Sequence, residues 1–229
     1  MNVLFTNRNI LADNVWELLS SLYTVGFLNE SMLVGSWVMP LYQESFGINY
    51  VLRTQDVDFA IEFANETKPR TTVADIDKIM IDLGYLPILL QSGIRKFSRK
   101  KFSVEFIGHR QGGREDEMLP IKKWNLSAIP LPFIDILLAF PFTADFTDIK
   151  IKVPLPEAFF VHKLIIAPRR RDRSKQLKDL EQCAIISNAL DKNRLKEVVE
   201  FLKPSRKTQR AMIGSCGKIQ FPIKELGLQ

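Results

Sequence analysis

The sequence has little cysteine and little histidine. Cys183 and Cys216 are its two cysteines, and neither belongs to a Cys-x-x-Cys pair. This excludes a disulfide framework and a zinc ribbon, and it favours a reducing compartment. His162 has no second histidine at metal-ligand spacing, so a histidine-based zinc site is not supported.

Long apolar runs are also missing. The longest, around residues 134–142, is interrupted by Asp135 and Pro141 and is too short to cross a bilayer. The first residues include the polar Asn2 and Asn7, so they lack the charged-then-apolar order of a secretion signal. We therefore expect a cytoplasmic protein that makes no membrane contact.

What the sequence does contain is an ordinary globular composition with an excess of positive charge. Of its 229 residues, 46% are apolar and 25% are charged, which is enough for a sizeable core. The formal net charge is +6. This charge favours an anionic partner, whether a nucleotide, RNA or a phosphate surface.

The apolar pattern changes character along the chain. Helical spacing predicts helices over residues 9–27, 37–46, 73–83, 157–167, 172–190, 193–202 and 208–216. Short or alternating apolar runs predict strands over residues 32–34, 55–63, 94–98, 102–107 and 147–153. The expected fold is α/β (α+β), with a short mixed sheet flanked by helices in residues 1–150 and a helical part in residues 151–229.

Acidic residues stand where strand alternation brings them together. Asp56 and Asp58 are two residues apart on a predicted strand, so they project from the same face. Two adjacent carboxylates repel each other unless a divalent cation neutralises them, and magnesium suits that role. If the strand 102–107 lies beside the first, Glu105 joins the acidic face as a third ligand.

A Gly-Ser pair supplies a second element. Gly35 and Ser36 follow a short apolar run and precede a predicted helix. A helix that begins after a glycine turn presents free N–H groups and its positive end to a phosphate. Taken alone, this pair is a weak signal.

Together these features resemble a known family. The Gly-Ser turn, the segment 53–59 and a third acidic strand occur in this order in the DNA polymerase β-type nucleotidyltransferase superfamily. The segments 153–164 and 169–180 resemble a bacterial group of nucleotidyltransferase-like proteins of mostly unassigned substrate. More distantly, the arrangement is similar to abortive-infection nucleotidyltransferase toxins. The resemblance covers about residues 30–190.

The resemblance implies a metal centre. Asp56 and Asp58 would bind Mg²⁺ or Mn²⁺, and Glu105 would be the third acid, which takes the proton of the acceptor hydroxyl. Aspartate is commoner at this third position, and glutamate is longer by one methylene. A displacement of that size lowers reaction rates substantially.

The resemblance also implies a nucleoside triphosphate such as ATP as substrate. Gly35 and Ser36 would hold the triphosphate, Lys163 would contact a phosphate, and Lys178 with Asp179 would line the cleft. The helical part would close one side of that cleft. The implied reaction moves a nucleoside monophosphate onto a hydroxyl of RNA such as tRNA, a protein or a small molecule. The similarity to toxins adds an antitoxin protein as a possible partner class.

Three alternatives remain open. Lys163 follows an apolar helix start and can simply extend to the surface. The basic run 169–178 can be a solvated face, or it can steer an anion with Arg171, Lys175 and Lys178 on one side of a helix. The whole chain can be a non-catalytic nucleotide- or RNA-binding module that keeps the fold, in which Glu105 marks lost chemistry.

Overall fold

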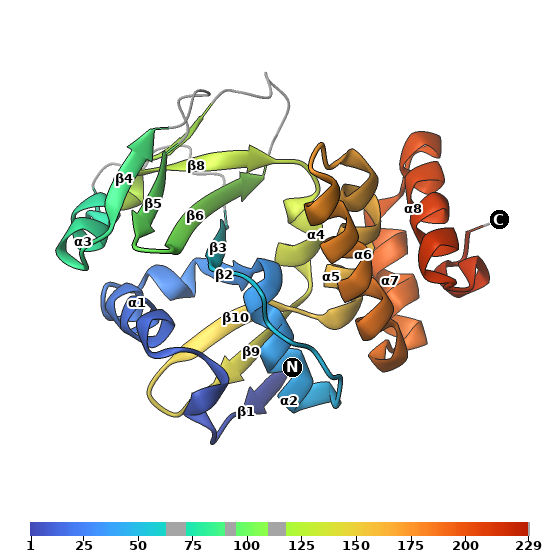
Figure 1. Ribbon diagram of the computed structural model, residues 1–229, viewed down its shortest axis with the longest axis horizontal. Helices are drawn as coiled ribbons and strands as arrows, with labels where there is room; N and C mark the ends of the chain where they lie inside the picture. Colours follow the sequence, from blue (N-terminus) through green and yellow to red (C-terminus); the bar gives the residue numbers. More distant parts are fainter. Residues whose placement is uncertain (63–71, 90–94, 110–117, 229) are drawn as a thin grey trace.

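A mixed sheet occupies the upper left of Figure 1, with the C-terminal helices to its right. The computed structural model describes residues 1–62, 72–89, 95–109 and 118–228. The strand order is β2 (Ser31–Val34), β3 (Asp56–Ile61), β6 (Phe102–His109), β5 (Arg95–Arg99) and β4 (Leu86–Leu89). The end of β6 also pairs with β8 (Leu126–Leu131), which pairs in turn with β7 (Leu119–Ile121).

The directions of the strands make this sheet mixed. β3 runs antiparallel to β2 and parallel to β6, and β6 runs antiparallel to β5 and parallel to β8. The predicted fold class, a mixed sheet flanked by helices, is therefore confirmed. The parallel pair β3–β6 matters most for the site, because it aligns two strands from distant parts of the sequence.

A second, three-stranded sheet holds the N-terminus. β1 (Asn2–Leu4) pairs in parallel with β9 (Pro141–Asp145), which pairs antiparallel with β10 (Lys150–Pro154). Among the described residues, three α-helices precede β4: α1 (Asp13–Thr24), α2 (Met39–Phe46) and α3 (Ile76–Asp82). β10 lies next to β2, so the two sheets are adjacent.

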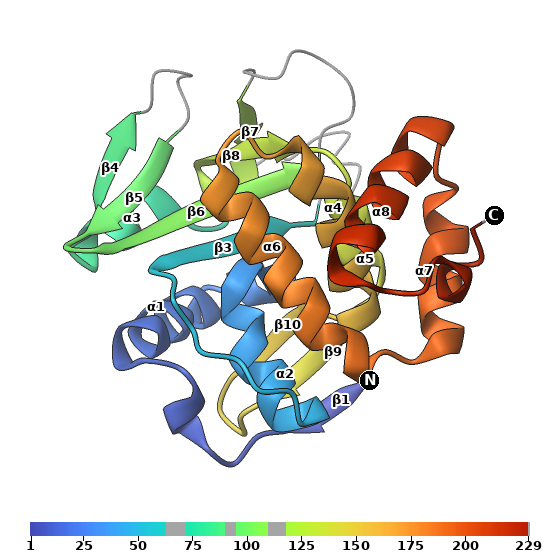
Figure 2. The ribbon, with the colours of Figure 1, turned by 45° about the vertical axis from the view of Figure 1, so that its right-hand side comes forward.

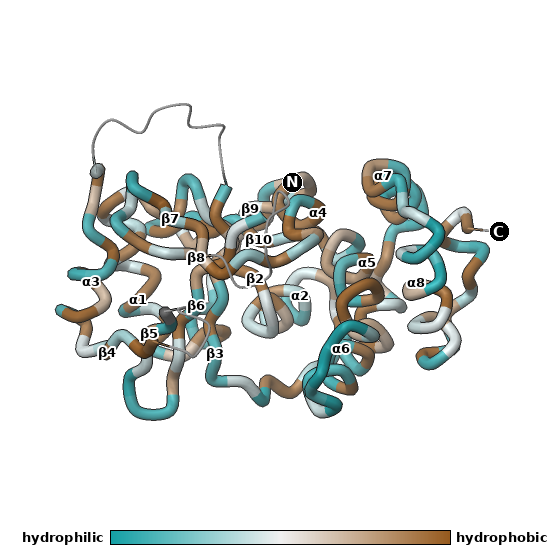
Figure 3. Tube along the Cα trace, turned by 90° about the horizontal axis from the view of Figure 1, so that it is seen from above, coloured by the Kyte–Doolittle hydropathy of each residue, from teal (hydrophilic) through white to brown (hydrophobic). Residues whose placement is uncertain are grey.

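The C-terminal part is helical. It contains α5 (Pro156–Ile166), α6 (Arg173–Ile186), α7 (Lys192–Leu202) and α8 (Arg206–Ile219), and the short α4 (Ile134–Ala139) packs against α5. Ten consecutive residues of α5 are buried, so this helix is surrounded on all sides. Hydrophilic residues occupy much of α6 (Figure 3). Capping carboxylates mark helix starts, as where Asp172 accepts hydrogen bonds from backbone N–H groups of α6.

The core of the sheet is aromatic. Phe27, Phe59 and Phe106 pack against one another, with ring centroids between 5.5 and 6.1 Å apart. Phe59 and Val57 project from the face of β3 opposite to its acids, and both are fully buried. The predicted acidic face of β3 is therefore separate from its core face over residues 56–59. Further along the strand, Ala60 lies on the acidic face but is buried too.

The predicted helices and strands are present with shifted ends, except that residues 63 and 94 of two predicted strands lie outside the described residues. The helix expected over 73–83 begins at Ile76, and the one expected over 172–190 is α6, which ends at Ile186. Among the α-helices and strands of the described residues, six were not predicted: β1, β4, β7, β8, α4 and β9. The division at residue 150 stays a prediction; β10 begins at that residue and pairs with β9. Within the described residues, no helix has the length and apolar character needed to cross a bilayer.

Candidate active site

The three predicted acids share one face of the sheet. In the register of β3 and β6, Asp58 is opposite Glu105, and Asp56 is opposite Ser103. Residues that are opposite each other in neighbouring strands project to the same side. The condition on which Glu105 was predicted, that its strand lies beside the first, is therefore met.

The folded protein disfavours ionisation of two of these carboxyl groups, Asp58 and Glu105. Burial, with repulsion from Glu105 and Asp56, raises the pKa of Asp58 to about 7. Burial also raises the pKa of Glu105, although Lys96 opposes that shift. Asp56 accepts a hydrogen bond of 2.5 Å from Ser103 Oγ. The site thus holds negative charge that the protein itself does not fully compensate.

The Gly-Ser turn closes the opposite side of this acidic face. β2 ends at Val34, which is the register partner of Asp58. Gly35 follows with φ +70°, a left-handed conformation that favours glycine. The turn then enters a short 3₁₀ helix (Gly35–Val38), and α2 begins only at Met39. The expectation that Gly35 directly precedes an α-helix needs this correction.

The second half of the site comes from α5 and α6. Lys163 on α5 donates to Asp179 on α6, and Arg170 Nε donates to the other Asp179 oxygen at 2.9 Å. Lys163 is 5% exposed, so the alternative that it extends to the surface is wrong. Burial disfavours ionisation of Asp179, but Lys163 and Arg170 outweigh it and hold the pKa of this carboxyl below its usual value.

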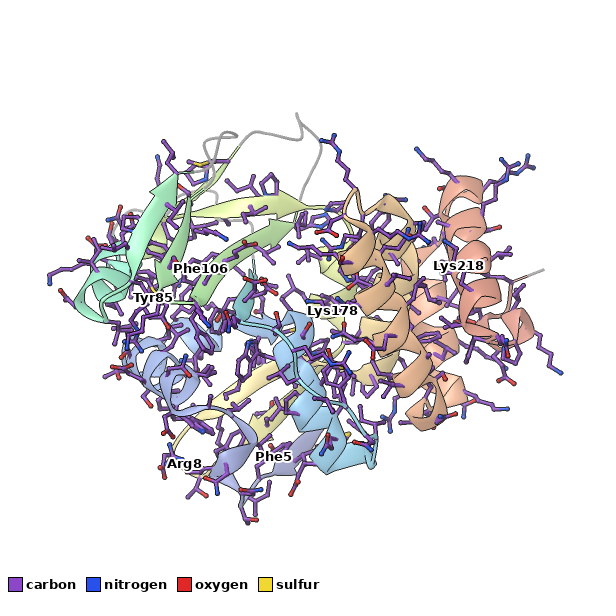
Figure 4. The ribbon with its side chains drawn as sticks, in the orientation of Figure 1. Phe5, Arg8, Tyr85, Phe106, Lys178 and Lys218 are labelled. Atoms are coloured by element: carbon purple, nitrogen blue, oxygen red, sulfur yellow. The ribbon has the colours of Figure 1, made fainter. Side chains whose placement is uncertain are left out.

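Lys178 is placed differently from Lys163. It projects from α6 into the space between the sheet and the helices (Figure 4). Burial and the neighbouring Lys163 lower the pKa of Lys178, while Asp179, Asp56 and Asp58 oppose that shift. Arg171 does not share this face, because it precedes the first residue of α6, Arg173.

One cleft gathers all of the predicted site residues. These are Gly35, Ser36, Asp56, Asp58, Glu105, Lys163, Lys178 and Asp179. Thr54, His162, Arg170 and Lys175 also line it. The acids come from the sheet and the cations from the helical part, so the cleft is a junction between the two. Figure 2 shows α6 running past β3 and α2 at this junction.

Sequence reasoning did not identify two contributors. Ser103 alternates with Glu105 on the same face of the strand, and this alternation was the available signal for its hydrogen bond with Asp56. Gln182 was not considered, although it follows Lys178 by four residues and so lies on the same face of α6. It donates to Ser36 Oγ at 2.9 Å.

His162 is buried beside this cleft. Burial, reinforced by Lys163, lowers its pKa to about 3, so the imidazole is neutral at physiological pH. Within the described part of the chain, its Nε2 has no hydrogen-bond partner.

The donor set favours a hard divalent cation. Asp56, Asp58 and Glu105 offer carboxylate oxygens, the ligands that Mg²⁺ and Mn²⁺ take. The described residues form no group of three or more His, Cys, Asp or Glu that could hold a metal ion by themselves. Magnesium is commonly bound by one or two carboxylates together with substrate phosphates. Asp58, whose pKa is raised by burial and by repulsion from Glu105 and Asp56, fits that mode.

Comparison with known proteins identifies the family and the fold of the chain. A family model described as "Nucleotidyltransferase" matches residues 13–203. No curated protein matches the sequence significantly. The fold is similar to the crystal structure of an antigenic nucleotidyltransferase-like protein from Paracoccidioides brasiliensis, with a TM-score of 0.50. That likeness covers 94% of this chain and 93% of the other at 13% identity, so it concerns the fold alone.

Proposed function

The chain belongs to the nucleotidyltransferase family whose model matches residues 13–203, and from this membership we propose that it transfers a nucleoside monophosphate to a hydroxyl acceptor. The observation that carries the proposal is the single cleft lined by carboxylates from the sheet and cations from α5 and α6. A nucleoside triphosphate carries several negative charges, so it needs both a metal site and cationic side chains.

Asp56 and Asp58 would hold Mg²⁺ or Mn²⁺, which when bound would neutralise phosphate charge and polarise the reacting phosphoryl group. The two carboxylates lie on one face of β3, and the raised pKa of Asp58 marks it as an acid that a cation would stabilise. Gly35 lies against the carboxylate of Asp58, and the Gly35-Ser36 turn would hold the triphosphate.

The cations of α5 and α6 would bind the remaining phosphate charge. Lys178 is in position to contact a phosphate directly. Lys163 is paired with Asp179, and its ammonium has further N–H groups that a phosphate oxygen could accept from. The cleft volume is about 110 Å³, whereas sites that enclose a whole small molecule measure about 300–1,000 Å³. We therefore expect the phosphates to be enclosed and the nucleoside to extend outward.

In the proposed reaction, the acceptor hydroxyl oxygen bonds to the α-phosphorus as the bond between that phosphorus and the bridging oxygen of the β-phosphate breaks. Pyrophosphate leaves, and Glu105 takes the hydroxyl proton. The raised pKa of Glu105 suits this role, because a general base works best when its pKa approaches the working pH. The acceptor would be RNA, a protein side chain or a small molecule. The finer resemblance to toxins, with an antitoxin partner, stays a prediction.

The direct test is a labelling experiment. The protein is incubated with Mg²⁺ and each α-labelled NTP in turn, together with total RNA, cell extract or small-molecule hydroxyl compounds. We expect at least one NTP to label an acceptor and to release pyrophosphate. The double variant Asp56→Ala/Asp58→Ala should be inactive, whereas Asp13→Ala, which removes an exposed carboxylate on α1, should keep full activity.

The rival function is a non-catalytic nucleotide- or RNA-binding module. Thermal melting experiments distinguish the enzyme from the binding module. An enzyme should gain stability from NTP only when Mg²⁺ is present, and the double aspartate variant should lose that gain. A binding module should respond to RNA or nucleotide without Mg²⁺ and irrespective of the two aspartates.

A further inference from the structure

A buried glutamine connects the helical part of the cleft to the Gly-Ser turn. Gln182 on α6 is fully buried. Its Nε2 donates to Ser36 Oγ at 2.9 Å and to Tyr50 Oη at 2.9 Å. Ser36 and Gln182 are 146 residues apart in the sequence, so this contact exists only because the fold brings the two halves together.

The chemistry of these bonds fixes the direction of the serine hydroxyl. An amide nitrogen only donates, and its two N–H groups are used by two hydroxyl oxygens. Ser36 Oγ therefore accepts from Gln182 and keeps its own proton to donate. Ser36 is 4% exposed and lines the cleft, so that proton can go either to Tyr50 Oη, with which Ser36 also forms a side-chain hydrogen bond, or to a group bound in the cleft.

Gln182 belongs to a face of α6 that carries the cations of the site. Lys175, Lys178 and Asp179 line the cleft, and Gln182 follows them at positions i+7, i+4 and i+3, which lie on one side of a helix. The same helix face thus presents positive charge to the cleft and holds the serine of the opposite wall.

We propose that Gln182 is a positioning residue that poises Ser36 as a hydrogen-bond donor to a phosphate oxygen of the nucleotide. This inference rests on the proposed function and extends it to a residue outside the cleft lining. Among the described residues, Gln182 Oε1 has no hydrogen-bond partner although it is buried. An unmatched buried carbonyl costs stability, so packing alone gives no reason for a glutamine at this position.

The test reverses the direction of the hydrogen bond between residues 182 and 36. In Gln182→Glu, the side chain keeps its shape, and its ionised carboxylate only accepts, so Ser36 donates its proton to residue 182 instead of to a bound group. Affinity is measured by calorimetry with Mg²⁺-NTP and, separately, with inorganic tripolyphosphate. We expect Ser36→Ala and Gln182→Glu each to weaken both ligands by about 10- to 100-fold, as expected for a hydrogen bond to a charged group.

The controls separate positioning from charge and from folding. Gln176→Glu adds the same charge to the same helix, but Gln176 donates to Ala167 O away from the cleft, so affinity should change by less than about threefold. In the Ser36→Ala background, Gln182→Glu should cause almost no further loss. In steady-state assays, KM for the NTP should rise while kcat changes little, which a general loss of folding would not produce.

Gln182→Met provides a second variant if Gln182→Glu does not fold. It removes the donor, and its effect should shrink when Ser36 is already alanine. Additive effects of the two substitutions, or wild-type affinity in Gln182→Glu, would overturn the inference while leaving the proposed function intact. A wild-type protein that binds no nucleotide at all would instead overturn the proposed function.

Discussion

Gly35 lies directly against the carboxylate of Asp58. A Cβ atom at position 35 would be 2.2 Å from Asp58 Oδ2 and 3.1 Å from its Cγ, far closer than van der Waals contact allows. The position also has φ +70°. Two independent constraints therefore require glycine here, and one of them is a contact with the proposed metal ligand.

Replacing this glycine should damage the site and the fold together. In Gly35→Ala, the new methyl group must displace Asp58 or the turn. We expect the free energy of unfolding to fall by about 1–3 kcal/mol and Mg²⁺-NTP binding to be lost. Urea denaturation and calorimetry measure the two effects.

Gly47→Ala is the matched control. Gly47 has φ +67°, but a Cβ there meets nothing within 4 Å. This variant should lose only the stability that a left-handed alanine costs, about 1 kcal/mol, and should keep nucleotide binding. Equal losses in the two variants would show that the contact with Asp58 has no consequence.

Asp58 should make the metal-free protein less stable as the pH rises. Its pKa is about 7 in the folded protein, against an ordinary value of 3.8. Between these pH values the folded state keeps a proton that the unfolded chain releases. The contribution of Asp58 to stability is therefore fully present below about pH 4 and is lost progressively as the pH rises to about 7. Asp58→Asn carries no charge and should avoid that loss.

We therefore expect Asp58→Asn to be inactive but more stable. At pH 8 its melting temperature should exceed that of the wild type by about 2–4 °C, or roughly 1 kcal/mol, and the difference should shrink toward pH 4. Melting curves across this range, without metal, check it. Asp13→Asn, at an exposed position, should show no such trend, and a variant less stable than wild type at pH 8 would contradict the reasoning.

Local patterns account for much of this fold. Alternation along residues 55–63 predicted the strand and its acidic face, because period-two spacing depends only on neighbouring residues. Strand β4 was not predicted, since Leu86 and Leu89 are exposed and Pro87 interrupts the pattern. A strand at the edge of a sheet, exposed on both faces, has no alternation to detect.

The arrangement of the site depends on long-range pairing, which the sequence does not display. The order of the acids indicated a shared face, but only the parallel register of β3 and β6 places Glu105 opposite Asp58. The pKa of Asp58 depends on burial, and the bond from Gln182 to Ser36 spans 146 residues. The spacing of residues along the sequence does not predict contacts between segments so far apart in the chain.

Asp179 should be essential for stability because of the charges around it. It accepts from both Lys163 and Arg170, and Lys163 is buried with its ammonium 5.1 Å from the centre of the Phe159 ring. Asp179→Ala would leave a buried ammonium without its carboxylate. We expect a loss of about 3–5 kcal/mol in the free energy of unfolding, measured by urea denaturation.

The control for this prediction is the double variant Asp179→Ala/Lys163→Met. Methionine has a similar length and no charge, so the double variant should recover part of the lost stability. Losses that simply add, with the double variant weaker than either single one, would show that Lys163 and Asp179 are not coupled in the folded protein.

Lys178 should contribute to binding rather than to stability. Its pKa is lowered by burial and by Lys163, so its charge is not favoured in the empty cleft. No ion pair of Lys178 occurs among the described residues. A bound triphosphate would supply the missing counter-charge. We expect Lys178→Met to weaken Mg²⁺-NTP binding by about 10- to 100-fold, the range for a hydrogen bond between charged groups.

The ligand-free Lys178→Met protein should melt within about 2 °C of the wild type, or slightly higher, because it no longer holds a half-buried cation beside Lys163. Lys207→Met, on the exposed surface of α8, removes the same charge from the chain without touching the cleft. It should leave both binding and melting unchanged, so a loss specific to Lys178 cannot be a net-charge effect. Equal affinities in the two variants would mean that Lys178 does not contribute to phosphate binding and that the other cations of the cleft supply it.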